Sequence, residues 1–136
     1  MDFAWLSRWQ AELRAILRII VALLFIEHGL IKLFGFPAGG MPGVQQAGTL
    51  LWVGGIIELV TGVLVLLGLF TRPAAFVAAG EMAVAYFMFH APQGFYPAIN
   101  MGEGAILYCF VFLYFAAAGP GAWSIDASRG KAAAIR

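Results

Sequence analysis

Four long apolar stretches constrain the fold of this chain more than any other feature of its sequence. Each is close to the roughly 20 residues that a helix needs to cross the hydrocarbon core of a bilayer. They cover residues 15–34, 47–70, 73–91 and 100–118. The composition agrees, since 62% of the residues are apolar and only 11% are charged, which is unusual for a soluble domain. We therefore predict a single all-α domain over residues 1–136, an integral membrane bundle of four transmembrane helices.

The distribution of lysine and arginine predicts the orientation of this bundle in the membrane. Basic residues precede the first stretch, occur at Arg72 and follow the fourth stretch, whereas the loops 35–46 and 92–99 carry no charge. Positively charged segments stay in the cytoplasm, so both termini should be cytoplasmic. Before the first stretch, apolar residues such as Phe3 and Trp9 recur at helical spacing. This pattern predicts an N-terminal amphipathic helix at the membrane interface.

Each predicted span carries one glutamate. The four are Glu27, Glu58, Glu81 and Glu103. An ionised side chain at the centre of a lipid-facing helix costs about 2.5–3.5 kcal/mol, so these acids should face one another, a base or a water-filled cavity. The firm cations within the spans are Arg18 and Lys32. We therefore expect at least one glutamate to hold or share a proton at neutral pH, with Glu58, Glu81 and Glu27 as proton-relay candidates.

The polar residues of the first and fourth spans suggest a common site near the outer side of the membrane. At about 100° per residue, His28 and Lys32 fall on one face of the first helix together with Arg18. On the fourth span, Asn100 and Glu103 lie one turn apart. If these two helices are neighbours, His28, Lys32, Asn100 and Glu103 could converge on one head group. Two alternatives stay open: the glutamates could serve only as hydrogen bonds between helices, and Arg18 could snorkel to the headgroups.

Several classes of function are not expected. The formal net charge of +1 provides no general basic surface, so nucleic acid is an unexpected partner. A single cysteine, Cys109, excludes an intramolecular disulfide and a Cys-x-x-Cys pair, and any redox role would need a borrowed cofactor. Haem ligation by His28 and His90 is not expected, because they lie at different depths. The methionines are interpreted as packing residues, and no metal site is predicted.

Four blocks of the sequence, in this order, resemble the DoxX family of bacterial inner-membrane proteins with four helices. The blocks are RIIVALLFIEHGLIKLFGF, GGIIELVTGVLVLLGLFTRPAA, EMAVAYFMFHAPQGFYP and NMGEGAILYCFVFLYFAAAGPGAWSID, and the resemblance covers residues 14–126. Polar residues match the family's pattern at Arg18, His28 and Lys32 in the first helix, Glu58 in the second, and Asn100 and Glu103 in the fourth. The resemblance implies a multi-pass protein of the bacterial inner membrane. Members of that family are linked to thiosulfate:quinone oxidoreductase, to membrane oxidoreductase complexes in oxidative-stress defence and to catabolic operons for aromatic compounds.

The leading functional hypothesis is therefore a redox accessory or quinone-interacting subunit in the lipid bilayer, with a partner oxidoreductase or a second copy of the chain as its protein partners. Arg18, His28, Lys32, Asn100 and Glu103 would bind the ligand, and the deeper glutamates would relay protons. Two other hypotheses use the same residues. The chain could be a small-molecule or proton-coupled permeation protein, or a non-enzymatic membrane anchor or assembly factor for a partner oxidoreductase. Whether the chain is an enzyme stays open on the sequence alone.

Overall fold

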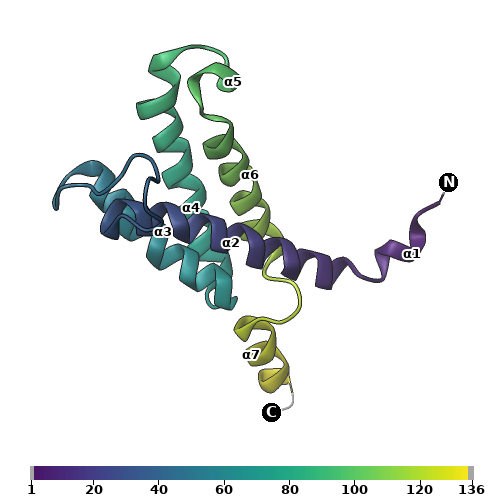
Figure 1. The fold of residues 1–136 in the computed structure, drawn as a ribbon. Coiled ribbons are helices and arrows are strands. Elements are labelled where there is room, and N and C mark those ends of the chain that lie inside the picture. The colour runs from purple at the N-terminus through teal and green to yellow at the C-terminus, as the bar shows by residue number, and fades with distance from the viewer. Residues whose placement is uncertain (1, 135–136) are drawn as a thin grey trace.

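The computed structural model describes residues 2–134, and every regular element in that range is helical (Figure 1). The α-helices are α1 (Ala4–Ser7), α2 (Gln10–Phe34), α3 (Leu50–Leu67), α4 (Thr71–Ala85), α5 (Pro97–Asn100), α6 (Glu103–Ala118) and α7 (Ile125–Ala134). A π-helical turn η1 (Tyr86–His90) and a 3₁₀ turn η2 (Ala91–Gln93) extend α4 without a break. The predicted all-α class is confirmed.

The long helices begin and end where the local sequence favours it. The Thr49 hydroxyl accepts a hydrogen bond of 3.3 Å from the Trp52 N–H and so caps the start of α3. Gly35 and Gly68 follow α2 and α3 in the left-handed conformation, with φ of 70° and 65°, which glycine adopts without steric cost. The fourth long helix begins at Glu103 rather than at residue 100, because Met101 takes a left-handed conformation with φ of 61°.

Two helical rods are long and apolar enough to cross a membrane, namely Leu50–Leu67 and Thr71–Gln93. Helix α6 is apolar but has only 16 residues, and the 25 residues of α2 include several charged side chains. Helix α1 has four residues, all exposed, and two residues separate it from α2. Four crossings and an N-terminal interfacial helix therefore remain predictions for this chain.

The long helices form two hairpins. Helix α2 packs along α3, and α4 packs along α6, while α3 against α4 joins the two pairs. Helix α2 meets α6 over a shorter stretch, where the Phe25 ring lies 4.6 Å from the Phe112 ring between centroids. Figure 1 shows the hairpins diverging, with the loop after α2 and the turn at α5 far apart. The core lies mainly between α4 and α6, where small residues of α4 such as Ala75 and Ala78 pack near Phe112 and Phe115. Small residues let membrane helices approach closely, so this pairing fits a bilayer.

Arg18, in the N-terminal part of α2, binds the segment that follows α6. Its side chain is fully buried, and its guanidinium donates hydrogen bonds to the carbonyls of Pro120 (2.8 Å), Ala122 (3.3 Å) and Trp123 (2.8 Å). The charged group of Arg18 thus points at backbone carbonyls of the same chain.

Asp126 at the start of α7 ties the same segment to the joint between α3 and α4. Its carboxylate accepts hydrogen bonds from the N–H groups of Phe70 (3.0 Å) and Thr71 (2.9 Å). Burial alone would raise the pKa of Asp126, but these N–H donors, with Arg129 nearby, lower it overall. The end of the bundle that holds both terminal segments is therefore fastened by polar contacts.

Candidate functional site

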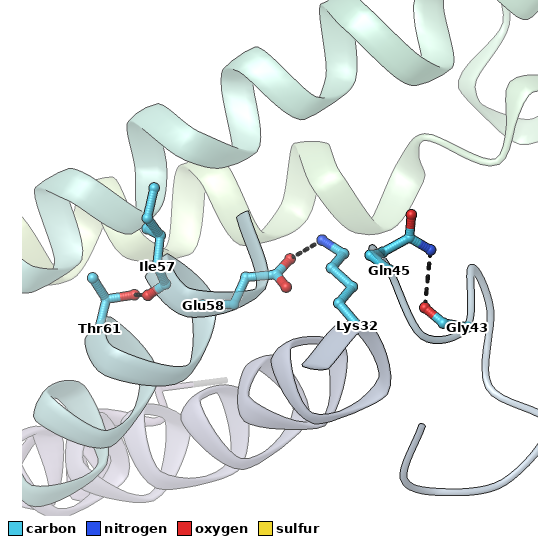
Figure 2. A network of polar contacts seen from close by, with 6 residues as sticks. All are labelled: Lys32, Gly43, Gln45, Ile57, Glu58 and Thr61. Carbon is cyan, nitrogen blue, oxygen red and sulfur yellow. Dashed lines mark hydrogen bonds and ion pairs between the residues drawn. The ribbon is translucent and has the colours of Figure 1, made fainter. Parts of the chain in front are cut away.

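A buried ion pair joins α2 to α3. Lys32 Nζ lies 2.6 Å from Glu58 Oε1, and the two residues are only 8% and 1% exposed. Figure 2 shows the two side chains pointing at each other from neighbouring helices. It is the only salt bridge within the described part of the chain. At hydrogen-bonding distance and nearly dry, the two charges attract each other more strongly than a surface pair would, and this attraction offsets the cost of burying them.

Two glycines let α2 and α3 come close enough for this contact. A Cβ atom on Gly29 would lie 2.8 Å from the carbonyl oxygen of Gly55, and a Cβ on Gly55 would lie 2.9 Å from the Cβ of Lys32. Neither position has room for a larger residue. The glycines therefore fix the helix spacing that places Lys32 against Glu58.

Glu81 of α4 brings a second carboxyl group to the same place. A Cβ on Gly54 would lie 3.1 Å from Glu81 Oε1 and 3.8 Å from Lys32 Nζ. Glu81 Oε1 and Lys32 Nζ therefore both lie beside Gly54, which has no side chain to keep them apart. The second oxygens, Glu58 Oε2 and Glu81 Oε2, are buried and have no hydrogen-bond partner among the described residues. Buried polar atoms are rarely left unpaired, so these two oxygens call for an explanation such as a proton or a ligand.

The cluster lies beside an apolar cleft between α3 and α4. The cleft has a volume of about 300 Å³, at the lower end of the range for small-molecule sites. Its walls are mostly aliphatic, and Lys32 and Glu81 are its charged lining residues. Representative apolar lining residues are Val53, Ile57, Val77, Val84 and Phe89. Gly80 also lines the cleft, and a Cβ placed there would meet nothing within 4 Å. We call Lys32, Glu58 and Glu81 with this space the ion-pair cleft.

A larger hollow of about 430 Å³ lies at the other end of α3, beside Leu67, Trp123 and Arg129. Its Trp123 is mostly exposed, and no unpartnered buried oxygen points into it. Volume alone would favour this hollow, but the ion-pair cleft has the chemically distinctive lining. Within the described residues, no group of three or more His, Cys, Asp or Glu side chains is arranged to hold a metal ion.

The other residues singled out from the sequence lie elsewhere. Glu27, His28 and Glu103 are exposed, and the His28 ring makes an edge-on contact with Tyr108 at 5.8 Å between centroids. Asn100 is buried, but its amide donates to the Gly94 carbonyl at 2.8 Å and accepts from the Gly102 N–H at 2.8 Å. Its polar atoms are thus used to shape the loop before α6.

The structure does not bring His28, Lys32, Asn100 and Glu103 together. Helix α2 packs on α3 rather than along α6, and the left-handed Met101 separates Asn100 from the helix that carries Glu103. Arg18 is 14 residues before Lys32, or about 21 Å along the helix at 1.5 Å per residue. Of the sequence candidates, Lys32, Glu58 and Glu81 meet. Gly54 and Gly80, which also line the cleft, were not singled out from the sequence, although each lies within four residues of a glutamate on its own helix.

Apolar helices that gather their charged groups between them are typical of helical membrane proteins. The comparison with known families agrees, because the DoxX family model matches residues 13–91. The chain belongs to the DoxX family.

Three relatives match most of this chain. An uncharacterized protein of Haemophilus influenzae is 46% identical over 125 residues, covering 89% of this chain and 93% of the relative. The inner membrane protein YqjF of Escherichia coli is 32% identical over 124 residues, covering 80% of this chain and 85% of that protein. An uncharacterized membrane protein of Mycobacterium tuberculosis is 29% identical over 133 residues, covering 86% and 81%. No solved structure matches.

Proposed function

We propose that this chain binds a lipophilic molecule with a hydrogen-bonding head group, of the quinone class, in the ion-pair cleft, and serves as a quinone-interacting or redox accessory subunit of the inner membrane. The observation that carries this proposal is the pair of unpartnered buried oxygens, on Glu58 and Glu81, beside an apolar space. Ligand sites typically combine an apolar wall with a few convergent polar groups. The family resemblance to quinone-linked proteins supports the choice of ligand class.

The residues present fit a quinone head group. The Lys32 ammonium has three donor hydrogens and gives one of them to Glu58, so it can also donate to a carbonyl oxygen of the ligand. The aliphatic wall of α3 and α4, including Val53 and Val77, suits the ring and the start of an apolar tail. A quinone supplies reversible two-electron, two-proton chemistry when bound, and any electron donor or acceptor would come from a partner oxidoreductase.

The charge count of the cluster indicates what these residues do with a proton. Lys32 contributes one positive charge, whereas Glu58 and Glu81 contribute two negative charges if both are ionised. A net charge inside a bundle in lipid is unfavourable, so the cluster is expected to hold one proton between its two carboxyl groups. That proton is available to a head group in the cleft, which gives Glu58 and Glu81 the role of proton donor and acceptor.

The same cluster is open to two other uses, which the test below separates from ligand binding. A proton-coupled permeation protein would use the carboxyl groups as a relay, and an anchor or assembly factor would use them only to hold helices together. Neither use requires the space beside Gly80. Filling that space therefore separates ligand binding from the other two functions.

The experiment uses a photoreactive, short-tailed quinone analogue added to the full chain in lipid nanodiscs, with labelled peptides identified by mass spectrometry. Gly80→Leu puts a side chain into the cleft without a clash, since nothing lies within 4 Å of the added Cβ. Gly104→Leu is the matched control, because Gly104 of α6 is equally open and lies outside the cleft lining.

We expect labelling of the α3 and α4 peptides that line the cleft, at least tenfold weaker for Gly80→Leu, or about 1.4 kcal/mol, and unchanged for Gly104→Leu. Equal labelling of both variants would refute the proposed site. Flux of protons or solutes into liposomes that responds to Glu81→Gln but not to Gly80→Leu would favour permeation instead.

A further inference from the structure

Glu27 and His28 occupy an unusual position on α2. Both side chains are exposed, and neither has a hydrogen bond or ion pair with another described residue, although the His28 ring also contacts Tyr108 edge-on. Glu27 lies seven residues before the end of α2, or about 10 Å inside it at 1.5 Å per residue. An acid facing lipid at that depth is unfavourable, and polar groups in a membrane segment normally meet one another or a partner. The exposed face of α2 is therefore incomplete in the single chain.

A regular apolar stripe runs along this same face. Leu13, Leu17, Ile20 and Leu24 follow one another at spacings of four, three and four residues, and each is 41–52% exposed. At about 100° per residue they fall within an arc of about 60°. The mean spacing of about 3.7 residues is close to the 3.6 residues of one helical turn, so these side chains keep to one face along α2. Lipid alone could cover an apolar stripe of this kind. The evidence that a protein covers it therefore comes from Glu27 and His28 beside the stripe.

The centre of the stripe falls midway between Glu27 and His28. On the same 100° spacing, Glu27 lies about 50° to one side of that centre and His28 about 50° to the other. In a dimer with a two-fold axis parallel to α2, residues on one side of the seam in one copy face residues from the other side of the seam in its partner. Glu27 of each copy would then face His28 of the other, at depths that differ by only about 1.5 Å.

We propose that two copies of this chain pair through the exposed face of α2, with Leu13, Leu17, Ile20 and Leu24 as the apolar seam and two reciprocal Glu27–His28 contacts at its end. The occupant is a second copy because the face is self-complementary: it carries an acid on one side of the seam and a base on the other. The contact leaves the ion-pair cleft free, because Lys32 and Glu58 lie between α2 and α3. It is thus independent of the proposed function.

The first test is a disulfide cross-link between two copies of the chain in lipid nanodiscs. Copies with a short tag and copies with a long tag are mixed before reconstitution. Cys109→Ala removes the native thiol, and Leu24→Cys places a single thiol on the seam. A matched control, Val63→Cys in the same background, puts the thiol on an exposed position of α3. We expect a disulfide-linked product of two copies for Leu24→Cys, with both tags present, and at least tenfold less for Val63→Cys. A product containing a different protein, or equal yields, would overturn the proposal.

The second test exchanges the charges. Glu27→His gives a chain with two histidines at the seam, and His28→Glu gives one with two glutamates, so each should self-associate at least tenfold more weakly than the native chain. Mixed together, the two variants should associate with each other as strongly as native chains do, which also demonstrates that both are folded. Native-like self-association of the single variants, or no recovery on mixing, would overturn the reciprocal contact.

Discussion

Replacing Lys32 with methionine removes the cation from the buried pair while keeping a side chain of similar length. Glu58 is 1% exposed and its Oε2 already has no partner, so the variant leaves a buried carboxyl group with neither a counter-charge nor a hydrogen bond from Lys32. Removing one partner of a buried pair typically costs about 3–5 kcal/mol. We expect a loss of unfolding free energy in that range at neutral pH. Lys131→Met, which removes an exposed lysine of α7, should change it by less than about 0.5 kcal/mol.

The assay is reversible unfolding in mixed micelles, with increasing denaturing detergent, for the native chain, Lys32→Met, Glu58→Leu and the double variant. The double variant should recover most of the loss, because an apolar pair of similar volume is often as stable as a buried ion pair. A loss below about 1 kcal/mol for Lys32→Met, the value typical of an exposed pair, would refute the claim that this pair is dry. Additive effects in the double variant would show that the two residues are not coupled.

Three further outcomes are expected. The pKa of Asp126 is lowered in the folded chain, so its contribution to stability is present above its ordinary value of 3.8 and is lost as the pH falls below that value; hydrogen exchange of α7 should show this end loosening in acid, and Asp126→Asn should remove the dependence. Gly29→Val should destabilise the chain by about 1–3 kcal/mol, measured by the same unfolding assay, because its Cβ would lie 2.8 Å from the Gly55 oxygen, whereas Gly130→Ala should not. Reporters of cytoplasmic location should be active at both termini, and reporters of external location within 35–46 and 92–99; an externally active C-terminal fusion would contradict four crossings.

The helices could be predicted from the sequence because long apolar runs leave a membrane chain few other conformations. The break in the helix just before α6 could not be predicted from the sequence. Residues 100–103 read as one helical turn, and only the structure shows Met101 with a φ of 61°, a conformation that non-glycine residues adopt infrequently. Helical spacing therefore placed Asn100 and Glu103 on one face, although a left-handed residue separates them. Local periodicity carries no information about such a single-residue reversal.

The three charged residues of the ion-pair cleft were among the sequence candidates, but their grouping was not predicted. Lys32, Glu58 and Glu81 stood out because each is a charged group within an apolar run. Which helix lies beside α2 depends on the close contact between Gly29 and Gly55, and a glycine in one helix does not reveal its partner. His28 lies only about 40° from Lys32 around α2, yet that rotation takes its side chain from the buried side to an exposed one. Helical spacing correctly placed both residues on one side of α2, but it did not show that only one of them is buried.

The ion pair also allows stability and function to be separated, because a buried pair is weak evidence for stability on its own. If Lys32 and Glu58 served only to hold α2 against α3, Lys32→Met with Glu58→Leu would leave a bundle that behaves like the native chain in every assay. In the proposed function the same double variant lacks the donor and one carboxyl group, and keeps the apolar cleft and Gly80. We therefore expect it to unfold like the native chain yet to lose photolabelling by the quinone analogue at least tenfold, or about 1.4 kcal/mol. Native labelling of a stable double variant would mean that Lys32 and Glu58 have no part in binding the ligand.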